Sequence, residues 1–296
     1  MNKILEASLV GNAYGFALHW IYDPQYIQDL IEKEDVFFKA PQKRHYDDAV
    51  SSFYGYPYGQ AGDVTTQGLF LLWLSEALHH NPQLSVDEYK SLLLSHIMPG
   101  QDYVGYIESY AKKLIANEIA MTFEKEPIFE MMDDHLVGFV PYIACKALSL
   151  PTSKAKELAT LFSSDQDYGH LFDMFDVFLN QLNPENKKQL LTQVIDLAPQ
   201  TFKTKLQHAL SEEDDDLFIE HHSGIACVIP QSIPLIFRII NRASTYEDAM
   251  VMNVKYGGAI SERAMMLGLV FSHLSEVPTT WSNQLNEKHR LVIQAL

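Results

Sequence analysis

The sequence predicts an all-α protein, folded as a single-domain multi-helix bundle over residues 1–296. Three observations indicate this fold class. Apolar residues recur at three- and four-residue spacing along much of the chain, as in helices with one buried face. No series of alternating strands bounded by hairpin turns accompanies them. No linker rich in Pro, Gly or Ser divides the chain, so we expect many helices to share one core.

The helical pattern begins near the amino terminus and continues almost to the end of the chain. The apolar positions that mark the first three helices are Leu5, Leu9 and Phe16, then Leu69, Leu72 and Trp73, then Tyr89, Leu92, Leu93 and Ile97. Later segments of helical length are 111–123, 136–148, 155–162, 171–182, 187–197, 233–240 and 247–255.

Two segments lack this pattern. Residues 36–62 mix Pro and Gly with aromatic and polar residues, and long loops in compact domains are often functional. The aromatic run 53–58 could stack on a nucleobase or close over a sugar, or it could pack on the protein's own helices. The acidic run 212–216 is typical of a solvated loop between helices, because five adjacent carboxylates repel one another unless a cation joins them.

The charge balance limits the classes of partner. The chain has 38 acidic and 22 basic residues and a net charge of −16, which disfavours nucleic acid and anionic membranes. No apolar run approaches the roughly 20 residues of a spanning helix, and the charged amino terminus lacks a signal-peptide pattern, so we expect a cytoplasmic protein. Cys145 and Cys227 lie in apolar surroundings and are expected to be buried free thiols.

A glycine pair, Gly257-Gly258, follows the helical segment 247–255 and predicts a sharp turn, since glycine tolerates positive φ. The next residues place an apolar stripe on one face of a new helix, at Ile260, Ala264, Leu267, Phe271 and Leu274. Exposed amides at the start of that helix could hold an anion. The alternative is an ordinary helix-turn-helix with a glycine C-cap.

The stretch 256–263 resembles the carboxy-terminal signature of the ADP-ribosylglycohydrolase family, where Gly-Gly-Asp-x-Asp-Thr supplies metal-binding carboxylates. Here Ala259 and Ser261 replace the two aspartates. Residues 11–15 (GNAYG), 62–67 (GDVTTQ) and 278–281 (PTTW) match further family segments in the family's order. The pentapeptide His-Trp-Ile-Tyr-Asp at 19–23 resembles the branch that contains the J1 crystallins. The resemblance spans nearly the whole chain and implies the ADP-ribosylglycohydrolase fold.

Asp63 is the first candidate for a catalytic residue and a metal ligand. It precedes a predicted helix, and Thr65 and Thr66 place hydroxyl oxygens beside it. Such oxygen donors suit Mg²⁺, although one carboxylate cannot complete a site. Mg²⁺ is thus the cofactor that the resemblance implies, at a weakened or absent site, and no organic cofactor is expected. The alternative is that Asp63 caps the helix.

His19 to Asp23 form the second candidate cluster. His19 could act as a general acid or base if Asp23, four residues later, orients its imidazole. Because Pro24 favours a helix end, the alternative is that His19 and Trp20 pack in the core and Asp23 caps.

The third cluster, Asp133-Asp134-His135, precedes a predicted helix and falls where the family has a turn that could line the same cleft. Asp134 could act in catalysis there, or it could cap the helix. The adjacent His221 and His222 point in different directions on a regular element and are not a helical metal motif.

Two functions remain open from the sequence. The first is a hydrolase of ADP-ribosyl or related glycosidic bonds, with Asp63, His19 and Asp134 as catalytic residues. The residues expected to contact its ADP-ribose-like substrate are Trp20, Tyr22, Asp23, Thr65, His135, Gly257, Gly258 and Ser261. The second is a non-catalytic member that binds a nucleotide-like ligand or a protein partner. The sequence predicts no oligomeric state.

Overall fold

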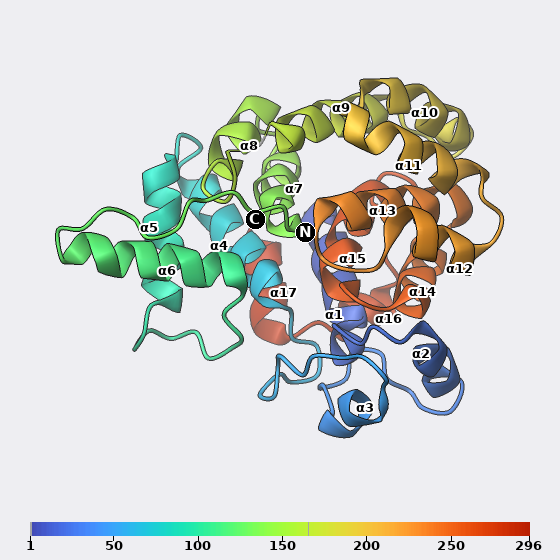
Figure 1. Ribbon diagram of the computed structural model, residues 1–296, viewed down its shortest axis with the longest axis horizontal. Helices are drawn as coiled ribbons and strands as arrows, with labels where there is room; N and C mark the ends of the chain where they lie inside the picture. Colours follow the sequence, from blue (N-terminus) through green and yellow to red (C-terminus); the bar gives the residue numbers. More distant parts are fainter. Residues whose placement is uncertain (1, 165) are drawn as a thin grey trace.

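The computed structural model describes residues 2–164 and 166–296, and it confirms the all-α class (Figure 1). Outside the helices, the described residues form only isolated β-bridges. The α-helices are α1 Lys3–Tyr14, α2 Pro24–Ile31, α3 Lys43–Asp48, α4 Thr66–His80, α5 Val86–Ile97, α6 Ser109–Thr122, α7 Val140–Ala147, α8 Thr152–Ala159, α9 Asp167–Gln181, α10 Lys187–Val194, α11 Gln200–Ser211, α12 Asp215–Phe218, α13 Ile229–Arg242, α14 Tyr246–Tyr256, α15 Ile260–Phe271, α16 Thr279–Ser282 and α17 Glu287–Ala295.

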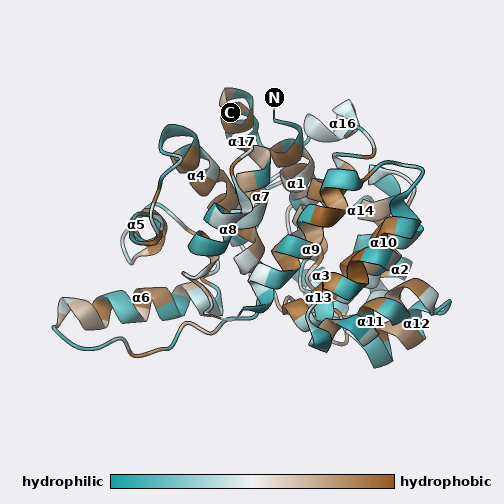
Figure 2. Ribbon diagram, turned by 90° about the horizontal axis from the view of Figure 1, so that it is seen from above, coloured by the Kyte–Doolittle hydropathy of each residue, from teal (hydrophilic) through white to brown (hydrophobic). Residues whose placement is uncertain are grey.

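Helices α1 and α15 form the centre of the molecule and pack along each other, although one begins the chain and the other lies near its end (Figure 1). Helix α15 was expected to bury one stripe, but all its residues are buried. Gly268 allows this close packing, because a Cβ there would lie 2.5 Å from the backbone of Ala7. In Figure 2 the outer helices α10 and α11 carry hydrophilic as well as hydrophobic residues.

The predicted helical segments are confirmed, with ends shifted by a few residues. Segment 136–148 begins as a 3-10 turn, Leu136–Phe139, before α7. Helix α3 lies inside the expected loop 36–62. The acidic run is only partly a loop, because Asp214 caps α12, which starts at Asp215. Its carboxylates were expected to be solvated, yet Asp215 pairs with buried Arg238.

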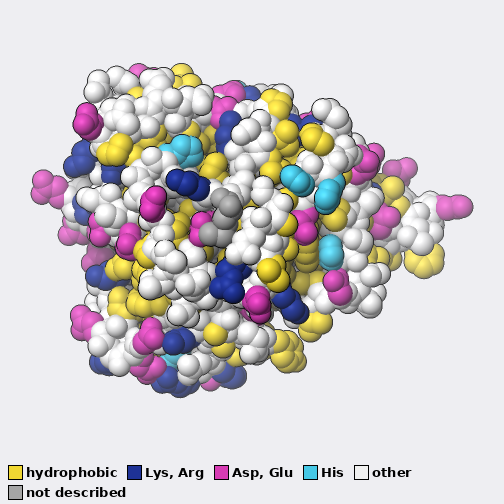
Figure 3. All heavy atoms as spheres, turned by 180° about the vertical axis from the view of Figure 1, so that it is seen from behind, with side chains coloured by type: hydrophobic (Ala, Val, Ile, Leu, Met, Phe, Trp, Pro, Cys, Tyr) yellow, Lys and Arg dark blue, Asp and Glu magenta, His cyan; other side chains and the backbone are white. Residues whose placement is uncertain are grey.

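Helix α6 and the loop after it project from the body of the molecule (Figures 1 and 2). Large hydrophobic side chains are exposed on this projecting arm, which we define as residues 104–132. They are Val104, Ile119, Met121, Phe123, Ile128, Phe129 and Met132. Figure 3 shows hydrophobic and acidic side chains at the projecting end. Within the described part of the chain, no helix combines the length and the apolar character that crossing a bilayer requires.

Candidate functional site

Three segments that the family resemblance singled out meet at the side chain of Asn12. Its amide nitrogen donates to Thr65 Oγ1 at 2.9 Å and to the Ser261 carbonyl at 3.1 Å. Its amide oxygen accepts from the Thr65 backbone amide at 2.8 Å. Asn12 therefore joins α1, the start of α4 and the start of α15 in one buried junction.

The glycine pair forms the sharp turn that was predicted. Gly257 and Gly258 have φ of 73° and 68°, in the left-handed region that favours glycine. A Cβ on Gly258 would lie 2.0 Å from the Ile225 carbonyl oxygen. Arg263, completely buried, secures the turn by donating to the carbonyls of Gly257 and Ile225.

The amides of this turn are already used within the protein. The Gly258 amide donates to the Ile21 carbonyl at 2.7 Å, and the Ala259 amide donates to the Ile225 carbonyl at 2.9 Å. The Ser261 amide donates to His19 Nδ1 at 3.2 Å. The expectation of exposed anion-binding amides is wrong here, because the first turn of α15 is buried and bonded to its neighbours. Contacts of Gly257 and Gly258 with a substrate stay a prediction.

His19 lies in this buried cluster and is 1% exposed. Burial, and then the charge of Arg263, hold its pKa well below the ordinary value, so the imidazole is neutral. Its Nδ1 accepts from Ser261, which places the hydrogen on Nε2, 3.9 Å from Glu262 Oε1. Glu262, rather than the predicted Asp23, is therefore the carboxyl group nearest to the histidine's other nitrogen.

Two buried glutamates lie together, and one of them, Glu262, is the neighbour of His19. Glu262 and Glu108 are 1% and 3% exposed. Burial, and then the charge of Glu108, raise the pKa of Glu262 well above its usual value. Burial also raises the pKa of Glu108. Two carboxyl groups in one low-dielectric site cannot both ionise cheaply, so this pair retains a proton above the pH at which exposed glutamates ionise.

Polar atoms gather around this pair without full hydrogen bonding. Gln67 Nε2 donates to Glu262 Oε1 at 2.7 Å. Among the described residues, several buried atoms of the cluster have no hydrogen-bond partner of normal geometry: His19 Nε2, Gln67 Oε1, Glu108 Oε1, Tyr110 OH, Ser261 Oγ and Glu262 Oε2. Unpaired buried polar groups cost free energy, and natural proteins keep few of them without a functional or structural reason. The cluster is therefore the candidate functional site.

Aromatic side chains close over this site. Trp20 and Tyr56 stack with ring centroids 5.4 Å apart, and the Trp20 ring lies 4.5 Å from the His19 ring. Trp20 adopts a φ of 70°, uncommon for a bulky residue, and its amide is held by the Gly258 carbonyl at 2.8 Å. Tyr22 and Tyr106 pack against the same group. Of the two alternatives for the aromatic run 53–58, Tyr56 therefore fits the second, because it packs on the protein's own residues.

Asp63 lies at a different place from the buried cluster's hydrogen-bond network. Its Oδ2 accepts from the Gln60 amide and its Oδ1 from the Asn286 side chain, each at 2.8 Å. Thr65, rather than Asp63, caps α4. Asp63 therefore ties the turn before α4 to the start of α17, and its catalytic and metal-binding roles stay predictions.

Asp23 follows the capping interpretation. Its Oδ1 accepts from the Tyr26 amide at 3.1 Å and its Oδ2 accepts from the Val50 amide at 3.0 Å. Because Pro24 starts α2, Asp23 stands at the N-cap of that helix. Its carboxylate therefore does not orient His19.

The Asp133-Asp134-His135 group forms a second cluster of converging ligand atoms. His135 Nδ1 bonds to Asp133, which is 3% exposed, and Lys113 Nζ lies 3.2 Å from the same carboxylate. Burial lowers the pKa of His135, but the hydrogen bond and charge of Asp133 more than offset this and raise it. The protein's own cations therefore occupy Asp133. The Asp134 side chain is 56% exposed and does not cap the helix.

Sequence reasoning missed Glu108, Glu262 and Gln67 as site residues. Glu262 and Gln67 lie inside the segments that carried the resemblance, and Glu262 falls where the family signature has threonine. The glutamate in place of that threonine was therefore a usable signal in the sequence. Glu108 had none, because it stands outside every motif, at the N-cap position of α6.

A solved structure described as an "ADP-ribosylglycohydrolase-related protein complex" matches the fold over 99% of this chain and 96% of that chain, with a TM-score of 0.63. The fold is ADP-ribosylglycohydrolase-like. The two sequences are 12% identical, so the match shows the fold alone. No protein-family model matches the sequence, and a search of curated proteins finds no match.

Proposed function

We propose that this chain is a non-catalytic protein with an ADP-ribosylglycohydrolase-like fold, and that it acts by binding a protein partner. The observation that carries the proposal is the closure of the candidate site. His19 and Glu262 are each 1% exposed and Ser261 is fully buried, and Trp20 and Tyr56 stack over them. A glycoside of any size would have to displace this packing before it could reach His19 and Glu262.

The residues at the site do not fit the Mg²⁺ that the family resemblance implies. Ala259 and Ser261 replace two carboxylates, and Ala259 offers no ligand atom. Asp63 already accepts hydrogen bonds on both of its oxygens. Mg²⁺ prefers octahedral oxygen coordination with one or two carboxylates. We therefore propose a function that needs no Mg²⁺.

A protein partner is favoured over a nucleotide-like ligand. The amides of Gly258, Ala259 and Ser261 donate within the protein, which leaves them unable to bind a diphosphate. The projecting arm instead exposes large side chains such as Phe123 at 71% and Ile128 at 64%. Groups of exposed apolar side chains mark interaction surfaces.

Incubation with ADP-ribosylated peptides tests the proposal. Arginine-linked and serine-linked conjugates, with and without Mg²⁺ or Mn²⁺, are followed by release of free ADP-ribose. An active ADP-ribosylglycohydrolase serves as the positive control. We expect no release above buffer and no thermal stabilisation by the metal ions or by ADP-ribose.

Release that disappears in Asp63→Ala or His19→Asn, both still folded, would favour the hydrolase instead. In that case Asp63, His19 and Asp134 regain their expected catalytic roles. Stabilisation by ADP-ribose without release would favour the nucleotide-like ligand.

A further inference from the structure

A groove of about 510 Å³ lies between the first turn of α1, the loop that follows α15, and helices α16 and α17. None of the residues that line it belongs to the buried cluster around His19. In Figure 2 helices α1, α16 and α17 lie along one edge of the molecule. A groove of this volume is large enough for a small molecule.

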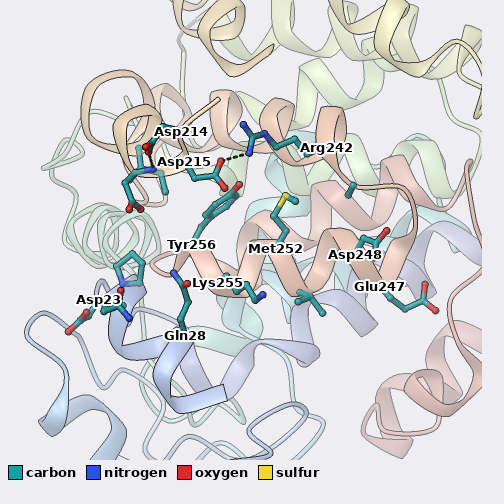
Figure 4. A pocket seen from close by; sticks show the side chains of 16 residues that line it. Asp23, Gln28, Asp214, Asp215, Arg242, Glu247, Asp248, Met252, Lys255 and Tyr256 are labelled. Carbon is teal, nitrogen blue, oxygen red and sulfur yellow. Dashed lines mark hydrogen bonds and ion pairs between the residues drawn. The ribbon is translucent and has the colours of Figure 1, made fainter. Parts of the chain in front are cut away.

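Arg290 of α17 lines this groove and is half-buried, yet its guanidinium has no hydrogen bond or ion pair within the described residues. Every other arginine of the chain bonds to an oxygen atom of the protein. Figure 4 shows one such pair in a different groove, where Arg242 lies 2.9 Å from Asp215. A guanidinium presents five N–H donors in a planar fork that matches a carboxylate. Arg290 therefore offers unused donors to an anionic group that enters the groove.

The charged side chains of this groove are balanced, but they do not pair with one another. Lys3 and Arg290 line it together with Glu6 and Glu276, and none of the four has an ion-pair partner in the described part of the chain. Lys3 and Glu6 are three residues apart on α1, a spacing at which opposite charges usually meet. Glu6 instead accepts a hydrogen bond from the Ser282 hydroxyl at 2.6 Å. This bond ties the Glu6 carboxylate to α16.

Two cations and two carboxylates in one groove are complementary to a ligand that itself carries both charges. A simple anion would be repelled by the two carboxylates, and a simple cation by Lys3 and Arg290. In a zwitterion, the carboxylate can accept two parallel hydrogen bonds from Arg290, and the ammonium group can donate to Glu276 and Glu6. The balance of charge also sets this groove apart from a chain whose net charge is −16.

The groove adds apolar surface to these charges. Leu274 and Val277 line it, and both are partly buried against the hydrophobic core. An aliphatic side chain that covers them would remove apolar surface from water. Charged groups of both signs next to an aliphatic chain are the chemical features of an aliphatic amino acid.

We propose that this groove binds a small zwitterion of the α-amino acid class with an aliphatic side chain. The inference goes beyond the proposed binding of a protein partner, and neither depends on the other.

Calorimetric titration of the full chain with L-leucine tests the groove. Two analogues separate the charges of leucine: isocaproate lacks its ammonium group, and isoamylamine lacks its carboxylate. We expect leucine to bind and each analogue to bind at least about tenfold more weakly. An analogue that binds as tightly as leucine would overturn the proposal, because one charge alone would then suffice.

Arg290→Gln removes the guanidinium and is expected to weaken leucine binding at least about tenfold. The matched control is Lys288→Gln, which removes an exposed cation of the same helix that does not line the groove. We expect the control to change the affinity less than about twofold. Equal affinity of the two variants for leucine, or no binding by the wild type, would contradict the proposal.

Glu276→Gln distinguishes the two charges of the ligand. It should weaken leucine binding about threefold and leave isocaproate bound no more weakly, because Glu276 is expected to contact only the ammonium group. Glu287→Gln, at an exposed position outside the groove, is the control. Thermal unfolding shows whether each variant is folded. Equal losses for leucine and isocaproate in Glu276→Gln would exclude the assigned contact. None of these results bears on hydrolysis, which is measured separately by ADP-ribose release.

Discussion

His19 Nδ1 accepts a hydrogen bond from the backbone amide of Ser261, and this bond joins positions 242 residues apart in the chain. The bond requires an imidazole that is unprotonated at Nδ1. The same histidine lies beside the carboxyl group of Glu262, at 3.9 Å from Nε2 to Oε1, without forming a short ion pair. His19 therefore serves as a neutral buried acceptor in the folded protein.

The contribution of His19 to the stability of the protein should fall as the pH drops below about 6.5, the ordinary pKa of histidine. Burial lowers the pKa of folded His19, so at mildly acidic pH the unfolded state binds more protons and is favoured. In His19→Asn, the amide oxygen replaces Nδ1 as acceptor. We expect this variant to be less stable by about 1–3 kcal/mol at pH 7.5, but to lose less stability between pH 7.5 and 5.5.

Denaturant unfolding at several pH values measures this dependence. Other buried histidines add to the total effect, so the comparison of wild type with variant isolates His19. Exposed His170→Asn is the control. An identical pH dependence in His19→Asn and wild type would contradict the assignment of His19 as a neutral buried acceptor.

Glu262→Gln should stabilise the protein at neutral pH. Burial and the charge of Glu108 raise the pKa of folded Glu262, so the folded state holds a proton that the unfolded state releases above about pH 4.3. The wild type therefore loses stability as the pH rises from that value toward the raised pKa. Glutamine keeps an acceptor for Gln67 and needs no proton.

We expect the variant to gain about 1–3 kcal/mol at pH 7, with the gain shrinking toward pH 4. Denaturation curves at both pH values check this, with Glu262→Ala as the comparison. The alanine variant should lose stability because it leaves a void and removes the acceptor of Gln67. If the glutamine variant is less stable than the wild type at both pH values, the Glu262 carboxyl group itself stabilises the fold and the prediction is wrong.

Gly258→Ala should destabilise the protein by at least about 2 kcal/mol, since a side chain costs free energy at positive φ. The φ of Gly258 is 68°, and the new Cβ would lie 2.0 Å from the Ile225 carbonyl oxygen. Gly169→Ala is a matched control inside α9, where a Cβ would meet only Lys156 carbons at 3.8 Å. That control should gain up to about 1 kcal/mol from helix propensity. Thermal unfolding of both variants distinguishes strain at the Gly258 turn from a general effect of replacing glycine with alanine.

The helices could be predicted because apolar residues at three- and four-residue spacing indicate which face of a helix is buried. The complete burial of α15 could not, since Ser261, Glu262 and Arg263 are polar residues that a stripe assigns to the exposed side. Their burial depends on partners from other segments, such as Gln67 and His19. Aspartates before helices gave ambiguous predictions, because a cap and a ligand use the same residue at the same place.

Restoring the family's carboxylates should not restore a metal site. Ala259 and Ser261 are fully buried, so the double variant Ala259→Asp/Ser261→Asp places two charges in the core beside Glu262. We expect a loss of several kcal/mol, the usual cost of uncompensated buried charge, and no recovery in millimolar Mg²⁺ or Mn²⁺. Thermal unfolding with and without the ions measures this. Ala259→Asn/Ser261→Asn adds similar volume without charge and should be less destabilised. Metal-dependent stabilisation of the aspartate variant alone would show that the scaffold still accommodates the cations.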